Sequence, residues 1–204
     1  EVFMAEHEAL ADRIAPEELI DFRIGIGTVL GMSDELFERT VAAAGENGWA
    51  VHTHLAEVRE EVTESTLLHG TSTIQHAGRS GLLEHEVIAG HCIWCSETDI
   101  GLLASRDVAV AHNPVANMIL ASGVCPVPRL LREGVRVGIG TDGAASNDSQ
   151  DMFGAIKTAA LLQKVHHLQA VAMTAPQVME MATIGGAKAL GMGQQIGSLE
   201  PGKR

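Results

Sequence analysis

The sequence predicts an α/β fold in which short strands and helices alternate along the chain. Short apolar runs typical of strands begin near residues 24, 50, 87, 108 and 135. A segment with helical spacing follows each of them, and caps or glycines separate the units. This alternation indicates right-handed βαβ units on a parallel sheet. The pattern alone leaves two architectures open: a doubly wound sheet, or part of a (β/α)8 barrel, of which five units would be just over half.

The elements expected in the first part of the chain are a weak helix within 1–21, a strand at 23–29, a helix after Ser33, a strand at 50–54 and a helix at 57–69. Ser33 is a favourable N-cap because Asp34 and Glu35 place negative charge in the first helical turn. Gly70 is expected to end the helix at 57–69, since glycine readily adopts the left-handed conformation that closes a helix.

The same unit recurs in the second part of the chain. The expected elements are a strand at 87–91, a helix from Ser96, a strand at 108–112, a short helix opened by Pro126 and Pro128, a strand at 135–141, a helix at about 149–165, and a final helical region from Thr174 to Leu190 interrupted at Gly185-Gly186. Thr174 and Gln177 form a capping box, which supports the start of that last region. All five strands are short and apolar, as expected for a sheet covered on both faces.

Composition excludes several classes of partner. The 204 residues carry a formal net charge of −12, which argues against binding to a phosphate backbone. Aromatic residues make up only 3%, so stacking on single-stranded nucleic acid is not expected. No apolar run approaches the ~20 residues of a membrane span. Three sparse cysteines fit a reducing compartment. We therefore expect a cytoplasmic protein with no nucleic-acid or membrane partner.

The stretch Val51–Glu57 carries the most suggestive local pattern. His52 and His54 are two residues apart on a predicted strand, so their side chains share a face, and Glu57 follows where the strand would end. Imidazoles and a carboxylate at one strand end suit a catalytic metal site with a proton shuttle. Histidines at strand ends are nevertheless more often ordinary polar residues than ligands.

Polar residues recur at the carboxyl ends of the predicted strands. In order along the chain they are His54 with Glu57, His91, His112 with Asn113, and Asp142. In a barrel these strand ends form one rim, where active sites lie. Packing alone does not explain four polar strand ends in succession, so the sequence predicts a site at this rim.

Two further motifs have weaker interpretations. Gly138–Gly143 matches GxGxxG, but it lies in the fifth unit and contains Asp142, so its glycines are expected to let the backbone turn beneath that aspartate rather than to bind a dinucleotide. Cys92 and Cys95 form a CxxC without a second pair, so we expect buried structural cysteines rather than zinc ligands or a redox dithiol.

Six motifs in order resemble one known family. They are His-Leu-Ala-Glu (54–57), Gly-His-Cys (90–92), Ala-His-Asn-Pro-Val-Ala-Asn (111–117), Leu-Ala-Ser-Gly-Val-Cys-Pro-Val (120–127), Gly-Thr-Asp-Gly-Ala-Ala-Ser-Asn (140–147) and Ala-Thr-Ile-Gly-Gly-Ala-Lys-Ala-Leu-Gly (182–191). This set resembles the amidohydrolase superfamily, in the branch of S-adenosylhomocysteine/methylthioadenosine deaminases, guanine and 8-oxoguanine deaminases, and triazine hydrolases.

The resemblance implies a role for each residue of the rim. His54 and Asp142 match positions that bind one divalent metal ion, with Zn²⁺ expected ahead of Fe²⁺. Glu57 matches the proton shuttle, and His91 matches the group that contacts the water or the leaving amine. Glu57, His91 and Asp142 would together contact the substrate and carry the catalysis. His52 is implied to be only a neighbour of the metal site.

The resemblance also implies an incomplete (β/α)8 metal-dependent hydrolase barrel with about five βα units, whose first three strands lie outside this chain. Residues 1–196 would belong to the catalytic barrel and residues 197–204 to the start of a C-terminal β-sandwich segment. The chain begins without Met and stops at Pro201–Arg204, so we expect a piece of a longer protein. The full-length parent is expected to be a homo-oligomer.

The implied activity is hydrolytic deamination of an amino-substituted N-heterocycle, such as an adenosine derivative, by metal-activated water. The enzyme would be a hydrolase of carbon–nitrogen bonds in cyclic amidines, with a small heterocyclic substrate. Deamination of guanine, 8-oxoguanine or cytosine, and hydrolysis of chlorinated s-triazines, remain alternatives. A catalytically silent fragment is an alternative of another class.

Overall fold

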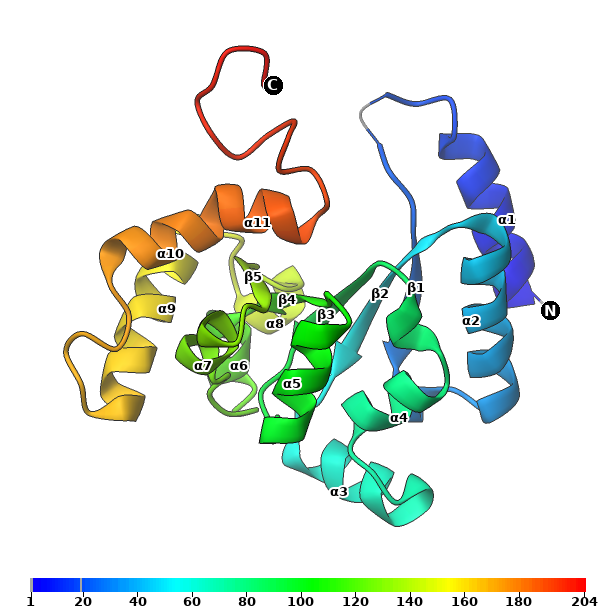
Figure 1. Ribbon diagram of the computed structural model, residues 1–204, viewed down its shortest axis with the longest axis horizontal. Helices are drawn as coiled ribbons and strands as arrows, with labels where there is room; N and C mark the ends of the chain where they lie inside the picture. The colour runs from blue at the N-terminus through cyan, green and yellow to red at the C-terminus, as the bar shows by residue number, and fades with distance from the viewer. Residues whose placement is uncertain (1, 19) are drawn as a thin grey trace.

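The computed structural model describes residues 2–18 and 20–204, and its centre is a parallel sheet of five strands (Figure 1). The strands are β1 Arg23–Thr28, β2 Ala50–Leu55, β3 Val87–His91, β4 Ala109–His112 and β5 Arg136–Ile139. In Figure 1, α1 and α2 lie on the β1 side of the sheet, and α9, α10 and α11 lie on the β5 side.

Helices fill every connection between the strands. The α-helices are α1 Val2–Ile14, α2 Asp34–Asn47, α3 Arg59–His69, α4 Thr73–Arg79, α5 Glu97–Ser105, α6 Pro114–Ile119, α7 Val127–Arg132, α8 Ala144–Asn147, α9 Met152–His167, α10 Ala175–Ala182 and α11 Ile184–Ala189. Two single-turn 3₁₀ helices cover Val29–Gly31 and Leu82–Glu84. Each of the five predicted strands is present, and its bounds differ from the prediction by at most two residues.

The strand order decides between the two architectures that the sequence left open. Each strand pairs in parallel with the strand before it in the chain, in the order β1-β2-β3-β4-β5. A doubly wound sheet reverses its order at a switch point, and no reversal occurs here. Right-handed crossovers in one direction place the connecting helices on one side, as in a barrel wall. The incomplete (β/α)8 barrel is therefore confirmed, and the doubly wound alternative is wrong.

The two faces of the sheet differ in chemistry because side chains alternate along each strand. Val51 and Leu55 of β2 are fully buried and join one large core with helix residues such as Phe37 and Leu103. His52 and His54 lie between them in sequence and face the opposite side, where His52 is exposed. The core thus lies between the sheet and its helices, and the other face presents imidazoles.

Helix α11 covers part of this second face. Ile88 is paired with His52 in the sheet and with Ala109 in the next strand, so all three side chains lie on the same face. Ile88 and Ala109 pack against Ala189 of α11 in a small separate cluster. The amino-terminal part of the face is therefore filled, and its carboxyl-terminal part, where His54 stands, is left free for polar groups.

Several short elements differ from expectation. The helices α4, α6 and α8 are not among the elements expected from the sequence, and α6 begins with Pro114 at its first turn. The final helical region breaks at Thr183, whose backbone angles are φ −121° and ψ −103°, and not at Gly185-Gly186. Residues 191–204 form turns without a helix or strand, so the predicted domain boundary at 197 stays a prediction.

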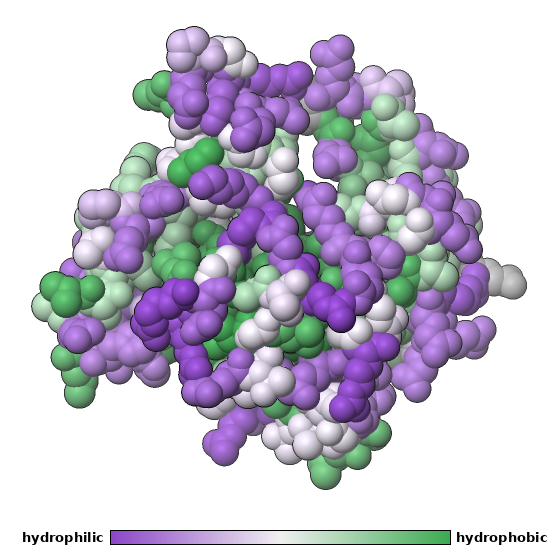
Figure 2. Space-filling model, viewed as in Figure 1, coloured by the Kyte–Doolittle hydropathy of each residue, from purple (hydrophilic) through white to green (hydrophobic). Residues whose placement is uncertain are grey.

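The surface is mostly polar on the side shown in Figure 2, where hydrophobic residues are seen in the central depressions and at some of the edges. Within residues 2–18 and 20–204, no helix combines the length and the apolar character needed to cross a bilayer.

Candidate active site

Three of the predicted site residues converge at the carboxyl end of the sheet. His54 comes from the end of β2, His91 from the end of β3, and Asp142 from the loop that follows β5. One ligand atom of each lies within 4.8 Å of the other two. The imidazole rings of His54 and His91 are stacked with their centroids 5.4 Å apart. Two imidazole nitrogens and a carboxylate oxygen form a donor set that suits Zn²⁺ or Fe²⁺.

Unusual backbone conformations bring two of these side chains into the site. His91 pairs with Leu55, so strand alternation would direct its side chain toward the helices, as it does for Leu55. Its φ of +67° turns the side chain to the His54 side instead. Asp142 has a φ of +63°, whereas Gly143 has a φ of −70°. The expectation that the glycines supply this turn is wrong, because the aspartate itself adopts the left-handed conformation.

Hydrogen bonds fix the orientation of both histidines. Nδ1 of His54 lies 2.7 Å from the carbonyl oxygen of Gly27, to which it donates its proton. Nδ1 of His91 donates to Oδ1 of Asn117 at 2.8 Å. In each ring Nδ1 therefore carries a proton, and Nε2 is the nitrogen left to face the site. Such second partners commonly orient histidines in metal sites.

Glu57 lies beside this group of side chains. Its Oε2 is 3.6 Å from Nε2 of His91, and the side chain is 20% exposed. Its Oε1 accepts a hydrogen bond from the Ser122 hydroxyl at 3.4 Å. The carboxylate thus reaches both the imidazole and solvent, which a group that exchanges protons requires.

Asp142 is stabilised as a carboxylate. Partial burial works against its ionisation, but hydrogen bonds from the Ser146 hydroxyl and the Gly143 amide, with the electrostatic effect of His91 and His54, outweigh it and lower the pKa of Asp142. The Ser146 bond is 2.7 Å long. An ionised carboxylate is the form that binds a metal ion.

Two glycines make room for these groups. A β-carbon on Gly90 would lie 3.3 Å from Cδ2 of His54, and one on Gly140 would collide with Oδ1 of Asn113. Gly138, the first glycine of the GxGxxG motif, lies against Gly186 of α11. The glycines of this motif therefore accommodate neighbouring protein atoms, which argues further against a dinucleotide site.

Two predicted rim histidines lie outside the group of three. His52 is on the same face as His54, with ring centroids 5.5 Å apart. Its ring reaches solvent, but partial desolvation by the surrounding protein, together with His54 and Arg23, lowers its pKa. His112 is completely buried, and neither of its ring nitrogens has a hydrogen-bond partner among the described residues. Burial, aided by His91, lowers the pKa of His112 to about 4.

The cysteines match the structural interpretation. Cys92 and Cys125 are buried, Cys95 is half-buried, and all three are free thiols. A hydrogen bond with Cys95 and burial raise the pKa of Cys92 well above its usual value, and burial does the same for Cys125. Such thiols are poor nucleophiles and poor ligands.

The sequence reasoning missed the residues that support the site. Asn117 orients His91, Ser122 contacts Glu57, and Ser146 holds Asp142. Only Ser146 had a local signal, because it lies four residues after Asp142 in a loop next to a predicted ligand. The other two come from α6 and the loop after it, and only the folded chain brings them to the strand ends.

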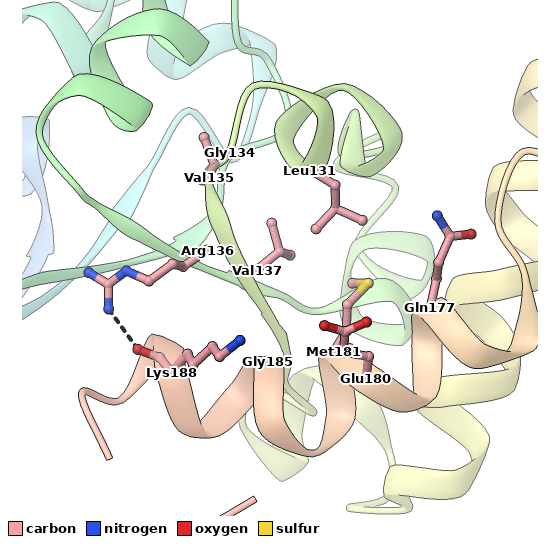
Figure 3. A pocket seen from close by; sticks show the side chains of 10 residues that line it. All are labelled: Leu131, Gly134, Val135, Arg136, Val137, Gln177, Glu180, Met181, Gly185 and Lys188. Carbon is pink, nitrogen blue, oxygen red and sulfur yellow. Dashed lines mark hydrogen bonds between the residues drawn. The ribbon is translucent and has the colours of Figure 1, made fainter. Parts of the chain in front are cut away.

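The pocket drawn in Figure 3 is separate from this site. It has a volume of about 320 Å³ and lies between β5, α7, α10 and α11, near the amino end of β5. Arg136, Lys188 and Glu180 are among its lining residues. Asp142 follows the opposite end of the same strand, so the pocket does not contribute to the candidate site.

Comparison with known proteins agrees with the geometry. The model of the amidohydrolase family matches residues 1–204. The chain is 47% identical over 171 residues to a 5'-deoxyadenosine deaminase of Methanothermobacter thermautotrophicus, covering 84% of this chain and 40% of the relative. It is 50% identical over 167 residues to a 5-methylthioadenosine/S-adenosylhomocysteine deaminase of Desulforudis audaxviator, covering 82% and 39%.

Solved structures show the same architecture. An adenosine deaminase from Xanthomonas campestris with bound zinc is similar at a TM-score of 0.92 and 38% identity, over 98% of this chain and 46% of that one. A triazine hydrolase from Arthrobacter aurescens gives a TM-score of 0.85 at 28% identity, over 98% and 44%. The chain spans about two fifths of the length of the curated relatives it matches. By its sequence and by its fold, the chain belongs to the amidohydrolase family.

Proposed function

We propose that the protein containing this chain is a metal-dependent deaminase that hydrolyses an amino group from an N-heterocycle of the adenosine type. The observation that carries this proposal is the placement of Glu57 beside three potential ligands, with 3.6 Å between Glu57 Oε2 and His91 Nε2. A nucleophile-generating site and a proton donor are thereby adjacent, as hydrolytic deamination requires. The deaminase names of relatives at 47% and 50% identity support the substrate class.

The residues present fit one divalent metal ion. The Nε2 atoms of His54 and His91 are the ring nitrogens turned to the site, because each ring uses its Nδ1 on a protein acceptor, and Asp142 offers an ionised oxygen. We assign His54 and Asp142 as ligands, and His91 as the group between the ligands and Glu57. When bound, the ion would supply the electrostatic activation that makes water nucleophilic near neutral pH. Zinc is favoured because a similar solved structure holds it.

Side chains of this chain carry out the proton transfers and stabilise the charge that develops. Asp142 accepts a proton from the attacking water at its carboxylate. Glu57 donates its proton to a ring nitrogen of the substrate, takes up a second proton from the hydroxyl group added at the carbon as the C=O bond forms, and passes that proton to the departing amine, which leaves as ammonia. The proton held on Asp142 then returns through solvent to Glu57. His91 donates a hydrogen bond toward the attacking oxygen and stabilises the charge that develops there. Glu57, His91 and Asp142 therefore all contact the substrate.

The Glu57→Gln variant tests this function in the natural protein that contains these residues. The variant keeps the shape of the side chain but cannot shuttle a proton, so kcat should fall by about 10²–10⁴-fold. Metal content should stay at the wild-type level, since Glu57 is not among the assigned ligands. Ammonia release and elemental analysis measure the two quantities. Full turnover by the variant would remove Glu57 from the mechanism.

A substrate panel separates the alternatives. We expect 5'-deoxyadenosine, methylthioadenosine and S-adenosylhomocysteine to release ammonia faster than guanine or cytosine. The similarity to a triazine hydrolase makes chloride release from a chlorotriazine the informative competitor. A protein that binds metal but releases neither product from any of these compounds would support the catalytically silent alternative.

Three further expectations belong to the same proposal. Metal analysis of protein purified without added metal would decide between zinc and iron. The three free thiols support a reducing, cytoplasmic location. The homo-oligomeric state stays a prediction, which light scattering would test.

A further inference from the structure

A buried carboxylate lies directly behind the turn that carries Glu57. Glu61, in the first turn of α3, is only 7% exposed. Its Oε1 accepts a hydrogen bond from the backbone N–H of Ala56 at 3.0 Å, and its Oε2 accepts one from the backbone N–H of Glu57 at 2.9 Å. The two oxygens of one carboxylate thus accept hydrogen bonds from two successive peptide groups.

This arrangement has a clear physical reason. Ala56 has a φ of +51°, which points its N–H and that of Glu57 to the same side and forms a concave anion-binding nest. An alanine in the left-handed conformation is unfavourable by itself. The hydrogen bond that the Ala56 N–H donates to the Glu61 carboxylate offsets that cost. Both N–H groups come from residues before Val58, the N-cap of α3, which offers no side-chain cap, so Glu61 ties the turn to the first turn of the helix.

The same turn is joined to the strand end that carries His91. The carbonyl oxygen of Ala56 accepts hydrogen bonds from the backbone N–H groups of Ile93 and Trp94, both at 2.9 Å. The N–H of Ala56 is shared with the Thr73 hydroxyl at 3.2 Å. The peptide groups around Ala56 therefore fix the segments after β2 and after β3 to each other.

We propose that Glu61 is a positioning residue for Glu57. By holding the two peptides of the turn, it fixes the backbone from which the Glu57 side chain extends toward His91. Glu61 itself lies behind the turn and does not touch the substrate. This inference rests on the proposed function, in which Glu57 moves the proton, but its structural part can be measured without turnover.

The test compares Glu61→Gln with Glu60→Gln in the natural protein that contains this chain. Both variants remove one negative charge from the first turn of α3, but Glu60 is exposed and is the matched control. The glutamine side chain has only one acceptor oxygen, and its NH₂ group faces the second of the two backbone N–H groups. One of the two hydrogen bonds is therefore replaced by repulsion between two donors. We expect a kcat that is about 10–100-fold lower for Glu61→Gln, with KM changed by less than about threefold. Glu60→Gln should match the wild type.

Hydrogen–deuterium exchange of the Ala56 and Glu57 amides gives a readout that is independent of activity. Exchange at these two positions should be at least about tenfold faster in Glu61→Gln and unchanged in Glu60→Gln. Unchanged exchange, or an unchanged kcat in an active enzyme, would overturn the inference. If the wild type released no ammonia while the exchange difference was observed, the proposed function would fail and the anchoring of the turn would stand.

A second variant covers the case in which Glu61→Gln does not fold. Thr73→Val removes only the shared acceptor of the Ala56 N–H and preserves the shape of a fully buried side chain. It should speed exchange at Ala56 more than at Glu57 and lower kcat by a smaller factor. Equal exchange at Ala56 in Thr73→Val and the wild type would contradict the proposed network.

Discussion

Charged side chains are paired at one end of the sheet and not at the other. At the amino ends, Arg23 of β1 bonds to Glu86 at 2.7 Å and Arg136 of β5 bonds to Asp107 at 2.8 Å. Both guanidinium groups also donate to backbone carbonyls at the end of α11 or just after it. At the carboxyl ends, His54 and His91 are stacked on each other next to Asp142, and among the described residues no lysine or arginine forms an ion pair with that carboxylate.

Unusual backbone conformations are also more frequent at the carboxyl ends of the strands than at the amino ends. Four non-glycine residues have a positive φ at or just beyond the carboxyl ends of the strands: Ala56, His91, Cys92 and Asp142. At the amino ends, within the described part of the chain, only Asp107, two residues before β4, has a positive φ without being a glycine. Strained backbone and unpaired titratable groups are costly, and they persist where function selects them. One end of the sheet thus stabilises the fold, and the other end holds the side chains of the proposed active site, at the end where barrel enzymes generally carry their chemistry.

The largest expected effect comes from the carboxyl end. Asp142→Asn removes the ionised oxygen from the group of three while keeping its size. Turnover in the natural protein should fall by about 10²-fold or more, and metal affinity should fall by more than the 10–100-fold typical of a residue that only supports a ligand. Isothermal titration with Zn²⁺ and ammonia release measure the two losses. Retained metal affinity would remove Asp142 from the ligand set.

His112 sharpens the comparison, because it is a titratable group at the carboxyl end that lies outside the group of three. Its pKa is lowered to about 4, below the ordinary 6.5, so below pH 6.5 the unfolded chain binds the proton more readily than the folded one. The resulting stabilisation is present above about pH 6.5 and is lost as the pH falls toward 4. A depression of this size amounts to about 3 kcal/mol.

The variant His112→Phe tests this pH dependence. It fills the buried space without a titratable ring, so the free energy of unfolding should fall less between pH 6.5 and 4 than in the wild type, by up to about 3 kcal/mol. The exposed His166 at the end of α9 provides the control in His166→Phe. Parallel pH profiles for His112→Phe and the wild type would show that His112 is not held neutral by the fold.

Much of this division could be predicted from the sequence, because it follows from strand periodicity. His54, His91 and Asp142 each follow a short apolar run, and parallel strands bring such positions to one edge. Glu57 was found because it lies three residues after His54. Local patterns of this kind are retained in the fold, since the strands that produce them are buried and regular.

The rest depends on information that local patterns do not contain. His91 faces the site only because of its positive φ, against the alternation of its strand. The side chain of Ser122 reaches Glu57 across 65 positions of sequence. The role of Glu61 in the Ala56 turn likewise depends on the helix start bending back onto the strand end. These contacts are set by tertiary packing, which overrides the local preference of each residue.

The smallest expected effect lies at the amino end and tests the other half of the comparison. Arg136 donates to Asp107 through Nε and to the Lys188 carbonyl at 2.6 Å through Nη1, a bond visible in Figure 3. Arg136→Met keeps the length of the side chain and loses these bonds. The free energy of unfolding should drop by about 1.5–3 kcal/mol, the range for hydrogen bonds to a charged group.

Turnover per folded molecule should meanwhile stay within about twofold of the wild type, because the side chain lies at the opposite end of β5 from Asp142. Urea unfolding with an unchanged slope gives the stability, and Arg132→Met, which removes an exposed guanidinium from the neighbouring α7, controls for the lost charge. If Arg136→Met lowered kcat per folded molecule well beyond this twofold limit, the two ends of the sheet would not be independent. The arginine anchors would then act on the site through the strand.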